Sequence, residues 1–203
     1  QMGGHAVFYG VEEGGFSRSE TLEDGVKVLS RYSDCIMARV LDQKAMERMG
    51  DIVTVPLING MTNKYHPCQN LADLLTIKEN KSRVEGLEIA YVGDGACNTA
   101  NSTMIGCSQV RMTVHIVCPD AIAFSPDRDL IKKINAVTGK EVKVFHEIEA
   151  GVKDVDVIYT DTWISAGMEE EKKKRMKVFT PYQVDSALMA KAKKDFAAGK
   201  ERA

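Results

Sequence analysis

Short strand-like runs alternate with helix-like segments along the chain, and this alternation limits the possible fold more than any other feature. Strands are expected at residues 5–9, 34–40, 54–58, 87–92, 113–118, 141–145 and 156–160. Helices are expected at residues 21–31, 43–49, 67–79, 98–110, 127–137, 148–152, 169–178 and 186–196. Such alternation predicts parallel sheets with helices on both faces, so the fold class is α/β.

A domain boundary is expected near residue 80. The stretch 80–86 is polar, ends in glycine and precedes a new strand. We therefore predict two domains, each a parallel sheet flanked by helices. The first covers residues 1–66, residues 67–80 form a connecting helix, and the second covers residues 81–203.

The composition disfavours two classes of partner. Of the 203 residues, 44% are apolar and 28% are charged, and the net charge is −2. This balance gives no support to binding of nucleic acid or of a membrane surface, and no run approaches the roughly 18 apolar residues of a membrane span. The five cysteines include no Cys-x-x-Cys pair, which indicates reduced thiols. A cytoplasmic location, or an organelle matrix, fits these features.

Residues 65–69, Tyr-His-Pro-Cys-Gln, carry the most specific chemical signal. Proline is tolerated in the first turn of a helix, so Pro67 is expected to open a helix with His66 at its cap. Residues three apart share a helical face, so His66 and Gln69 point the same way. Because a helix N-terminus also offers free N–H groups, the motif predicts a site for a small polar anion. The alternative is a capped surface helix with an incidental histidine.

Three further polar residues follow or adjoin the ends of expected strands. Arg39 follows the apolar run 35–38, Asn98 opens a helix after Gly-Asp-Gly at 93–95, and Asp161 follows the strand 156–160. Ligands of open α/β sheets bind beyond the carboxyl ends of the strands, so these residues are candidates for binding. The alternatives are a surface position for Arg39 and a capping role for Asp161.

The spacing of residues disfavours three familiar kinds of site. The sequence Gly-Asp-Gly-Ala-Cys-Asn at 93–98 lacks the Gly-x-Gly-x-x-Gly pattern of a dinucleotide site. Ser165 with His66 suggests a hydrolase, but no Gly-x-Ser-x-Gly elbow surrounds this serine. His66 and Cys68 are too few for a zinc site. Neither a metal nor a cofactor is therefore expected.

Two remaining features are expected to be structural. His5, His115 and His146 lie in or beside apolar strands and are predicted to pack there. The run Glu-Glu-Glu-Lys-Lys-Lys-Arg at 169–175 is acidic first and basic last, which complements the dipole of a helix. We expect this run to form a solvated helix face.

Taken together, six segments resemble one family, the ornithine carbamoyltransferases. These segments are Ser30-Arg-Tyr-Ser-Asp-Cys-Ile-Met-Ala-Arg39, Val55-Pro-Leu-Ile-Asn-Gly60, Tyr65-His-Pro-Cys-Gln69, Tyr91-Val-Gly-Asp-Gly95, Tyr159-Thr-Asp-Thr-Trp-Ile-Ser165 and Pro181-Tyr-Gln-Val184. They occur in the order and spacing of that family, and the match runs from residue 2 to about residue 196. The resemblance implies a two-domain, trimeric enzyme that makes citrulline and phosphate from ornithine and carbamoyl phosphate.

The resemblance also implies roles for particular residues. Arg39, His66 and Gln69 correspond to the residues that hold carbamoyl phosphate, so residues 1–66 are expected to be part of the carbamoyl-phosphate domain. The ornithine contacts, expected in the domain at 81–203, correspond to Asn98, Asp161 and Ser165, with Ala166 in the same loop. The chemistry agrees, because an attacked carbamoyl carbonyl develops negative charge that a guanidinium and an imidazole N–H stabilise. Asp161 suits the ammonium group of the substrate.

The sequence departs from the family pattern at several points. The family's Ser-Thr-Arg-Thr-Arg and His-Cys-Leu-Pro segments are absent, Ala166 stands where methionine is usual, and Cys97 stands where asparagine is common. We expect a fragment of a longer protein that is inactive by itself. The alternatives are a carbamoyltransferase for another amine, such as putrescine or an acylated ornithine, and a truncated non-catalytic relative.

Overall fold

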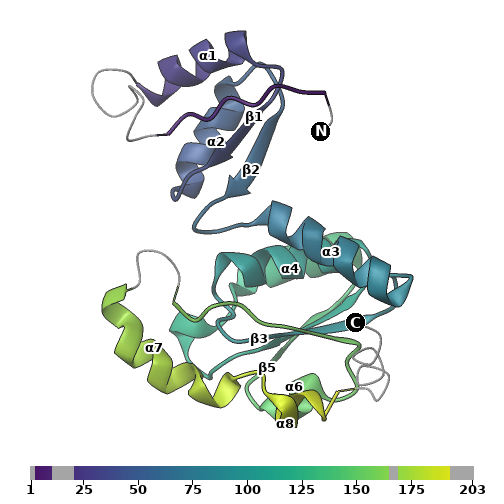
Figure 1. Ribbon diagram of the computed structural model, residues 1–203. Coiled ribbons are helices and arrows are strands. Elements are labelled where there is room, and N and C mark those ends of the chain that lie inside the picture. Colours follow the sequence, from purple (N-terminus) through teal and green to yellow (C-terminus); the bar gives the residue numbers. More distant parts are fainter. Residues whose placement is uncertain (1–2, 11–20, 165–168, 193–203) are drawn as a thin grey trace. The chain divides into compact units, whose positions relative to one another are not determined.

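The computed structural model describes residues 3–10, 21–164 and 169–192 (Figure 1). Contacts between residues divide the chain into two compact units, Gln1–Thr62 and Asn63–Ala203. Both units are built from parallel strands and helices, as the alternating pattern predicts. Each unit is described by itself below.

The first unit pairs two parallel strands and covers them with two helices. Its elements are α1 (Leu22–Tyr32), β1 (Ile36–Arg39), α2 (Gln43–Ile52) and β2 (Leu57–Met61). Thr21 caps α1 by accepting a hydrogen bond from the Asp24 N–H, and Asp42 caps α2 in the same way. The core of the unit is formed by buried side chains from both helices and from β1: Val26, Ala38, Met46 and Met49.

The predictions of two strands in the first unit are wrong. Residues 5–9 are extended but pair with no strand among the described residues, and Val7 and Phe8 are 82% and 88% exposed. The strand expected at 54–58 instead runs from Leu57 to Met61, after Pro56. Proline has no N–H for a strand ladder, although the Pro56 carbonyl still accepts a hydrogen bond from the N–H of Ile36.

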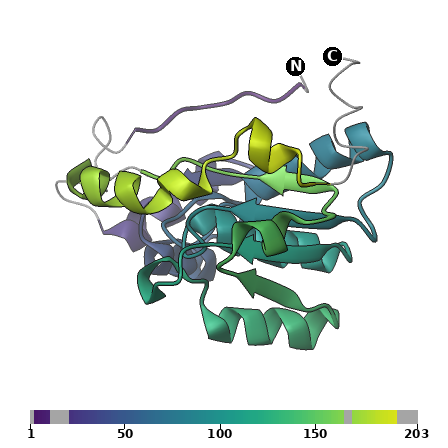
Figure 2. The same ribbon diagram turned by 90° about the horizontal axis from the view of Figure 1, so that it is seen from below.

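The second unit contains a parallel four-stranded sheet in the order β5-β4-β3-β6. Its strands are β3 (Glu88–Val92), β4 (Thr113–Val117), β5 (Val142–Phe145) and β6 (Val157–Tyr159). Its helices are α3 (Pro67–Lys81), α4 (Asn98–Gln109), η2 (Ile122–Phe124), α5 (Arg128–Thr138), α6 (Ile148–Val152), η3 (Glu169–Glu171), α7 (Lys172–Phe179), η4 (Thr180–Tyr182) and α8 (Ser186–Met189). In Figure 2, β5 and β6 lie at opposite edges of the sheet, and α5 lies next to β5.

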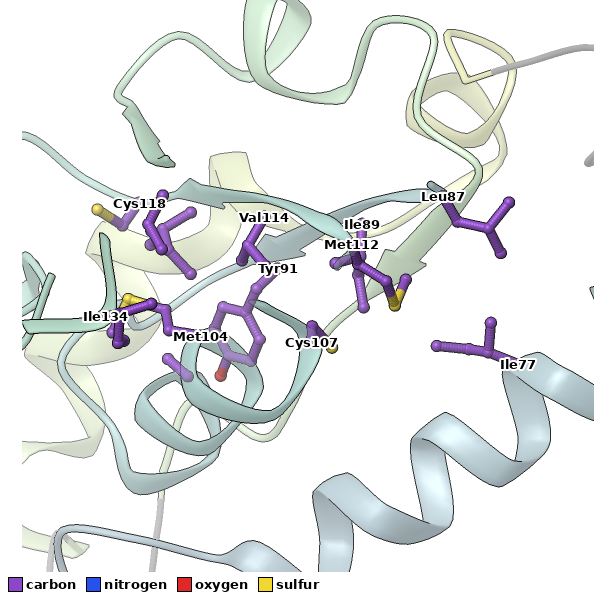
Figure 3. Close-up of a cluster of buried hydrophobic side chains, with 13 residues drawn as sticks. Ile77, Leu87, Ile89, Tyr91, Met104, Cys107, Met112, Val114, Cys118 and Ile134 are labelled. Atoms are coloured by element: carbon purple, nitrogen blue, oxygen red, sulfur yellow. The ribbon is translucent and has the colours of Figure 1, made fainter. Parts of the chain in front are cut away.

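Helices cover both faces of this sheet. In Figure 1, α3 and α4 lie on one side of the strands, and α6 and α8 lie on the other. Alternate residues of β3 point to opposite faces, so Ile89 and Tyr91 join one apolar cluster while Ala90 and Val92 join the other. Figure 3 shows the first cluster, in which Met104 of α4 is fully buried.

Helix α3 packs closely on α4 within the second unit. The two helices approach at Gly106, where an added Cβ would lie 1.8 Å from Oδ1 of Asn70. Asn70 is buried and its Nδ2 lies 3.7 Å from the sulfur of Cys107. Only glycine leaves room for this approach, and α3 is thereby fixed against the body of the unit.

Three other expectations have clear outcomes. The helix expected at 186–196 ends at Met189, and residues 193–196 lie outside the described part of the chain. All five cysteines are free thiols. His115 packs against Phe145 as expected, with ring centroids 4.9 Å apart and its Nδ1 2.9 Å from the Gly151 carbonyl.

Within the described residues, none of the helices is both long enough and apolar enough to cross a membrane.

Candidate functional site

Polar residues of the second unit gather at the carboxyl edge of its sheet. The chain leaves β3 through Gly93, whose φ of +140° lies in a region that glycine adopts without strain. Asp94 then accepts a 3.0 Å hydrogen bond from the N–H of Ala96, and this turn leads into α4. Cys97 caps α4 with its sulfur, and Asn98 is the first residue of the helix.

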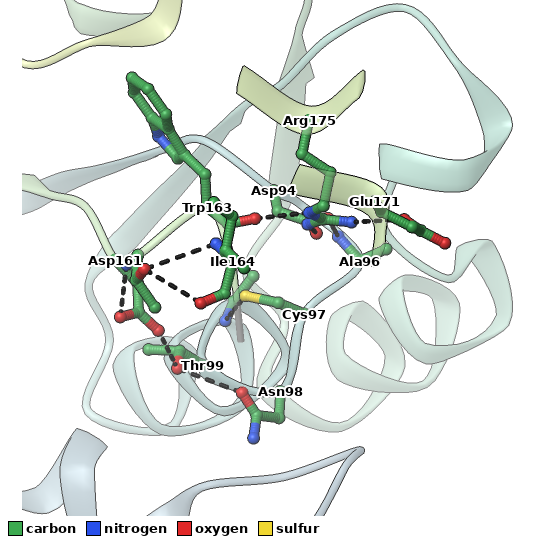
Figure 4. A network of polar contacts seen from close by, with 12 residues as sticks. Asp94, Ala96, Cys97, Asn98, Thr99, Asp161, Trp163, Ile164, Glu171 and Arg175 are labelled. Atoms are coloured by element: carbon green, nitrogen blue, oxygen red, sulfur yellow. Dashed lines mark hydrogen bonds and ion pairs between the residues drawn. The ribbon is translucent and has the colours of Figure 1, made fainter. Parts of the chain in front are cut away.

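The end of β6 meets the start of α4 through one short hydrogen bond. Oγ1 of Thr99 donates to Oδ2 of Asp161 over 2.7 Å, and it lies 3.3 Å from Oδ1 of Asn98 (Figure 4). The other carboxylate oxygen of Asp161 accepts from the N–H of Thr162. Asn98 and Asp161, two of the residues expected to bind ornithine, therefore lie together, joined by a threonine that sequence reasoning missed.

The start of α3 has the form that the sequence predicts. Pro67 opens the helix, and His66 is its cap residue, with its backbone N–H donating a 2.7 Å hydrogen bond to Oγ of Ser102 in α4. Gln69 lies one turn into the helix and donates from Nε2 to Oδ1 of Asp73 over 2.9 Å. His66 occupies the cap position of α3 with its backbone, while its side chain makes no capping hydrogen bond to the helix.

Asp73 was missed at the sequence level because it lies inside a helix-like run. Burial raises the pKa of its carboxyl group above the usual 3.8, while hydrogen bonds from Gln69 and Tyr159 act in the opposite direction. Asp161 raises and His66 lowers the same pKa through their charges, so both groups lie within electrostatic reach of Asp73. Burial in turn raises the pKa of the Tyr159 hydroxyl, with the charge of Asp73 adding to the effect.

A cavity of about 250 Å³ lies beside this cluster, between α3 and the β6 edge of the sheet. It is lined by residues of α3, α4, β3 and β6: Asn70, Asp73, Thr76, Ile77, Ile89, Thr103, Val157, Ile158 and Tyr159. The hydroxyl of Tyr91 lies nearby, 3.0 Å from the sulfur of Cys97. Burial raises the pKa of both of these groups, so both are protonated at neutral pH.

The other predicted site residues are placed less completely. Arg39 is the last residue of β1 in the first unit, where its side chain is exposed and the strand register shifts after Ala38. Its meeting with His66 remains a prediction. Ser165 and Ala166 lie outside the described residues. No group of three His, Cys, Asp or Glu side chains within the described residues is arranged to hold a metal ion.

The expectation of a solvated helix face at 169–175 is wrong at Arg175. Lys172, Lys173 and Lys174 are exposed, but Arg175 is only 5% exposed. Its guanidinium forms an ion pair with the buried carboxylate of Asp94, 81 residues away, as Figure 4 shows. All residues of the run 169–175 are charged, so no apolar pattern in the sequence indicates that Arg175 is buried.

Comparison with known proteins gives two adjacent family matches. The model described as aspartate/ornithine carbamoyltransferase, carbamoyl-P binding domain, matches residues 1–79. The model described as aspartate/ornithine carbamoyltransferase, Asp/Orn binding domain, matches residues 85–197.

Individual relatives agree with these matches. An ornithine carbamoyltransferase of Bacillus subtilis is 42% identical over 97% of this chain and 61% of its own length. The solved ornithine carbamoyltransferase of Pyrococcus furiosus is 42% identical with a TM-score of 0.86, covering 95% of this chain and 62% of that one. Aspartate transcarbamoylase of Trypanosoma cruzi, solved with N-(phosphonacetyl)-L-aspartic acid, is 26% identical with a TM-score of 0.80. The match covers 95% of this chain and 62% of that one. The chain thus spans 61–62% of the length of these relatives.

Proposed function

Because the chain belongs to the aspartate/ornithine carbamoyltransferase family, we propose that the protein transfers the carbamoyl group of carbamoyl phosphate to the side-chain amine of L-ornithine. The products are L-citrulline and phosphate. The choice of ornithine is carried by the 42% identity to proteins named ornithine carbamoyltransferase. The polar edge where Asn98, Thr99 and Asp161 meet supports an amino-acid site.

The first half of the proposed reaction is the activation of the carbamoyl carbonyl. The amine attacks the carbonyl carbon in its neutral form, and negative charge develops on the carbonyl oxygen. Phosphate then leaves with the electrons of the C–O bond and takes up the proton that the attacking nitrogen loses. Arg39 and His66 donate hydrogen bonds to the carbonyl oxygen, which stabilises the charge. Because Nε2 of Gln69 donates to Asp73, Oε1 of Gln69 is the atom that accepts a hydrogen bond from the carbamoyl NH₂ group.

The second half is the placement of the amine. Asp161 is an anion at the carboxyl edge of the sheet, and it attracts an ammonium group through a charge-assisted hydrogen bond. Asn98 offers both an amide donor and an acceptor to the amino-acid end of the substrate. Ornithine carries two ammonium groups and one carboxylate, so its net charge suits this edge better than the net charge of aspartate. Holding both substrates in register supplies the main acceleration without a covalent intermediate.

Domain roles and assembly follow the same proposal. Residues 1–66 belong to the carbamoyl-phosphate domain, residues 67–80 connect, and residues 81–203 belong to the ornithine domain. We propose a homotrimer in which a neighbouring subunit completes the carbamoyl-phosphate site, in the cytoplasm or an organelle matrix. Sedimentation of the protein from its complete coding sequence as a monomer at micromolar concentration contradicts this assembly.

A carbamoyltransferase for putrescine or an acylated ornithine is the second candidate. The observation that favours it is Ala166, whose side chain is smaller than that of the methionine usual at this position in the family. Putrescine has no α-amino-acid end, however, and gives Asn98 nothing to hold beyond its amines.

The deciding experiment compares amines on the protein expressed from its complete coding sequence. We expect ornithine-dependent formation of citrulline and phosphate in equal amounts, with much slower reaction of putrescine. We also expect Asp161→Asn to reduce the reaction of ornithine more than that of putrescine, because a charge-assisted bond is lost. Equal loss with both amines contradicts the role of Asp161, and a preference for putrescine contradicts the choice of ornithine.

A further inference from the structure

The guanidinium of Arg175 is enclosed within the second unit. It lies over the rings of Phe124 and Phe179, with its central carbon 5.4 and 5.2 Å from their centroids. Its Nη2 pairs with Asp94, its Nε donates to the backbone carbonyl of Trp163, and its Nη1 lies 3.6 Å from Oε2 of Glu171. Two of the three nitrogens thus have partners on segments outside α7, at Asp94 and Trp163, and the third lies near Glu171, the cap residue of α7 itself (Figure 4).

Two of these partners adjoin the proposed amine site. Asp94 lies in the turn that leads into α4, four residues before Asn98, and it also accepts the N–H of Ala96. Trp163 lies two residues after Asp161, and its ring stacks on Phe179 of α7 with centroids 6.2 Å apart. Arg175 therefore joins the segment that carries one ornithine candidate to the segment that carries the other.

We propose that Arg175 and Asp94 are positioning residues that set the separation of Asn98 and Asp161, and with it the affinity for the amino-acid substrate. This inference rests on the proposed function. The planar guanidinium is suited to the task because one rigid group meets a carboxylate and a carbonyl in fixed directions. The Thr99–Asp161 hydrogen bond is a second link between the same two segments. Loss of Arg175 therefore weakens the positioning of Asn98 and Asp161 but does not separate them.

A structural role and a positioning role predict different kinetics. Removal of Arg175 alone leaves a buried carboxylate without its cation, which destabilises the fold. Removal of both charges at once is often close to neutral for stability. The double variant Arg175→Met with Asp94→Asn therefore recovers stability, and the asparagine oxygen remains able to accept the Ala96 N–H. It does not restore the link to the Trp163 carbonyl.

The experiment measures thermal unfolding, the KM for ornithine and the Kd for carbamoyl phosphate in the protein from its complete coding sequence. In the double variant we expect a midpoint near that of the unsubstituted protein, a KM for ornithine raised about tenfold or more, and an unchanged Kd for carbamoyl phosphate. Arg175→Lys keeps the positive charge but not the planar group that donates in two fixed directions. Its KM for ornithine therefore rises while its thermal midpoint changes little. Lys191→Met, which breaks the exposed pair with Glu149, is the control and leaves the KM unchanged.

The contrary results are distinct. A double variant whose midpoint and KM both return to the unsubstituted values shows that the pair serves only stability and overturns the inference. A KM that changes in parallel with the midpoint across all variants does the same. If the unsubstituted protein forms no citrulline, the proposed function fails first and the inference fails with it.

Discussion

The hydroxyl of Thr99 donates a 2.7 Å hydrogen bond to Asp161, a residue 62 positions further along the chain. This contact ties the first turn of α4 to the end of β6 and fixes the direction of the Asp161 carboxylate. With the N–H of Thr162 bound to the other oxygen, each carboxylate oxygen retains capacity to accept a hydrogen bond from an ammonium group. The geometry of an amino-acid site is thus built from two segments that are distant in sequence.

Thr99→Val tests this contact directly. The substitution keeps the shape of the side chain but removes the hydroxyl, and a hydrogen bond to a charged group contributes about 1.5–3 kcal/mol. We expect the KM for ornithine to rise about tenfold, and the free energy of unfolding to fall by no more than the contribution of this hydrogen bond. Thr138→Val is the matched control, because the Thr138 hydroxyl binds a backbone carbonyl at the end of α5. An unchanged KM in Thr99→Val would separate Thr99 from the substrate site.

Arg39→Ala and His66→Ala are expected to reduce turnover far more than stability. Loss of one donor to a developing oxyanion typically lowers kcat by about 10²–10³-fold. Arg39 is exposed and His66 only half-buried, so truncation removes little packing. The measurement is kcat for citrulline formation beside thermal unfolding, with Arg48→Ala, an exposed arginine paired with Glu23, as the control. Normal turnover in either variant excludes that residue from the reaction.

Asp73→Asn is expected to change how stability depends on pH. Because burial raises the pKa of Asp73 above 3.8 in the folded protein, the folded state holds this proton more tightly than the unfolded chain does. The contribution of Asp73 to stability therefore falls as the pH rises above 3.8 through the folded pKa. Asparagine does not titrate and still accepts the Gln69 hydrogen bond.

The unfolding midpoint of Asp73→Asn, relative to that of the unsubstituted protein, should accordingly rise as the pH is raised above 3.8 through the folded pKa of Asp73. Thermal unfolding across this range is the measurement. Asp129→Asn, which changes an exposed carboxylate paired with Lys132, provides the comparison. A difference that is independent of pH would show that Asp73 has no raised pKa.

Gly106→Ala tests the close approach of α3 and α4. A Cβ at this position meets Oδ1 of Asn70, and forced overpacking typically costs about 1–3 kcal/mol. Gly50→Ala in α2 is the matched control: no atom lies within 4 Å of the added Cβ, and alanine in a helix is favoured by about 0.5–1 kcal/mol. Urea unfolding of the two variants should therefore give shifts of opposite sign. Shifts of the same sign would contradict the packing of α3 on α4.

The sequence was informative wherever one local rule decided the outcome. The start of α3 followed from Pro67, and the order of strands and helices in the second unit followed from the alternating pattern. The strand expected at 5–9 failed because a ladder needs a partner, which a local pattern does not reveal. The strand expected at 54–58 begins only at Leu57, because Pro56 has no N–H to donate to a strand ladder.

Long-range contacts between polar residues were beyond local reasoning. Asn98 and Asp161 were recognised as candidates, but nothing in the sequence joined them through Thr99. The burial of Arg175 was missed for the same reason, since its partner Asp94 is 81 residues away and its neighbours in the run are solvated lysines. Asp73 was hidden because a carboxylate inside a helix gains its chemical character only from tertiary burial.

The most direct test of carbamoyl transfer to ornithine is a competition in one vessel. The protein from its complete coding sequence is given carbamoyl phosphate labelled in the carbamoyl carbon, with ornithine, putrescine and aspartate at equal concentrations. Mass spectrometry then counts the label in each product. We predict that nearly all of it appears in citrulline. Label found mainly in carbamoylputrescine or carbamoylaspartate, or in none of the three products, would contradict the account.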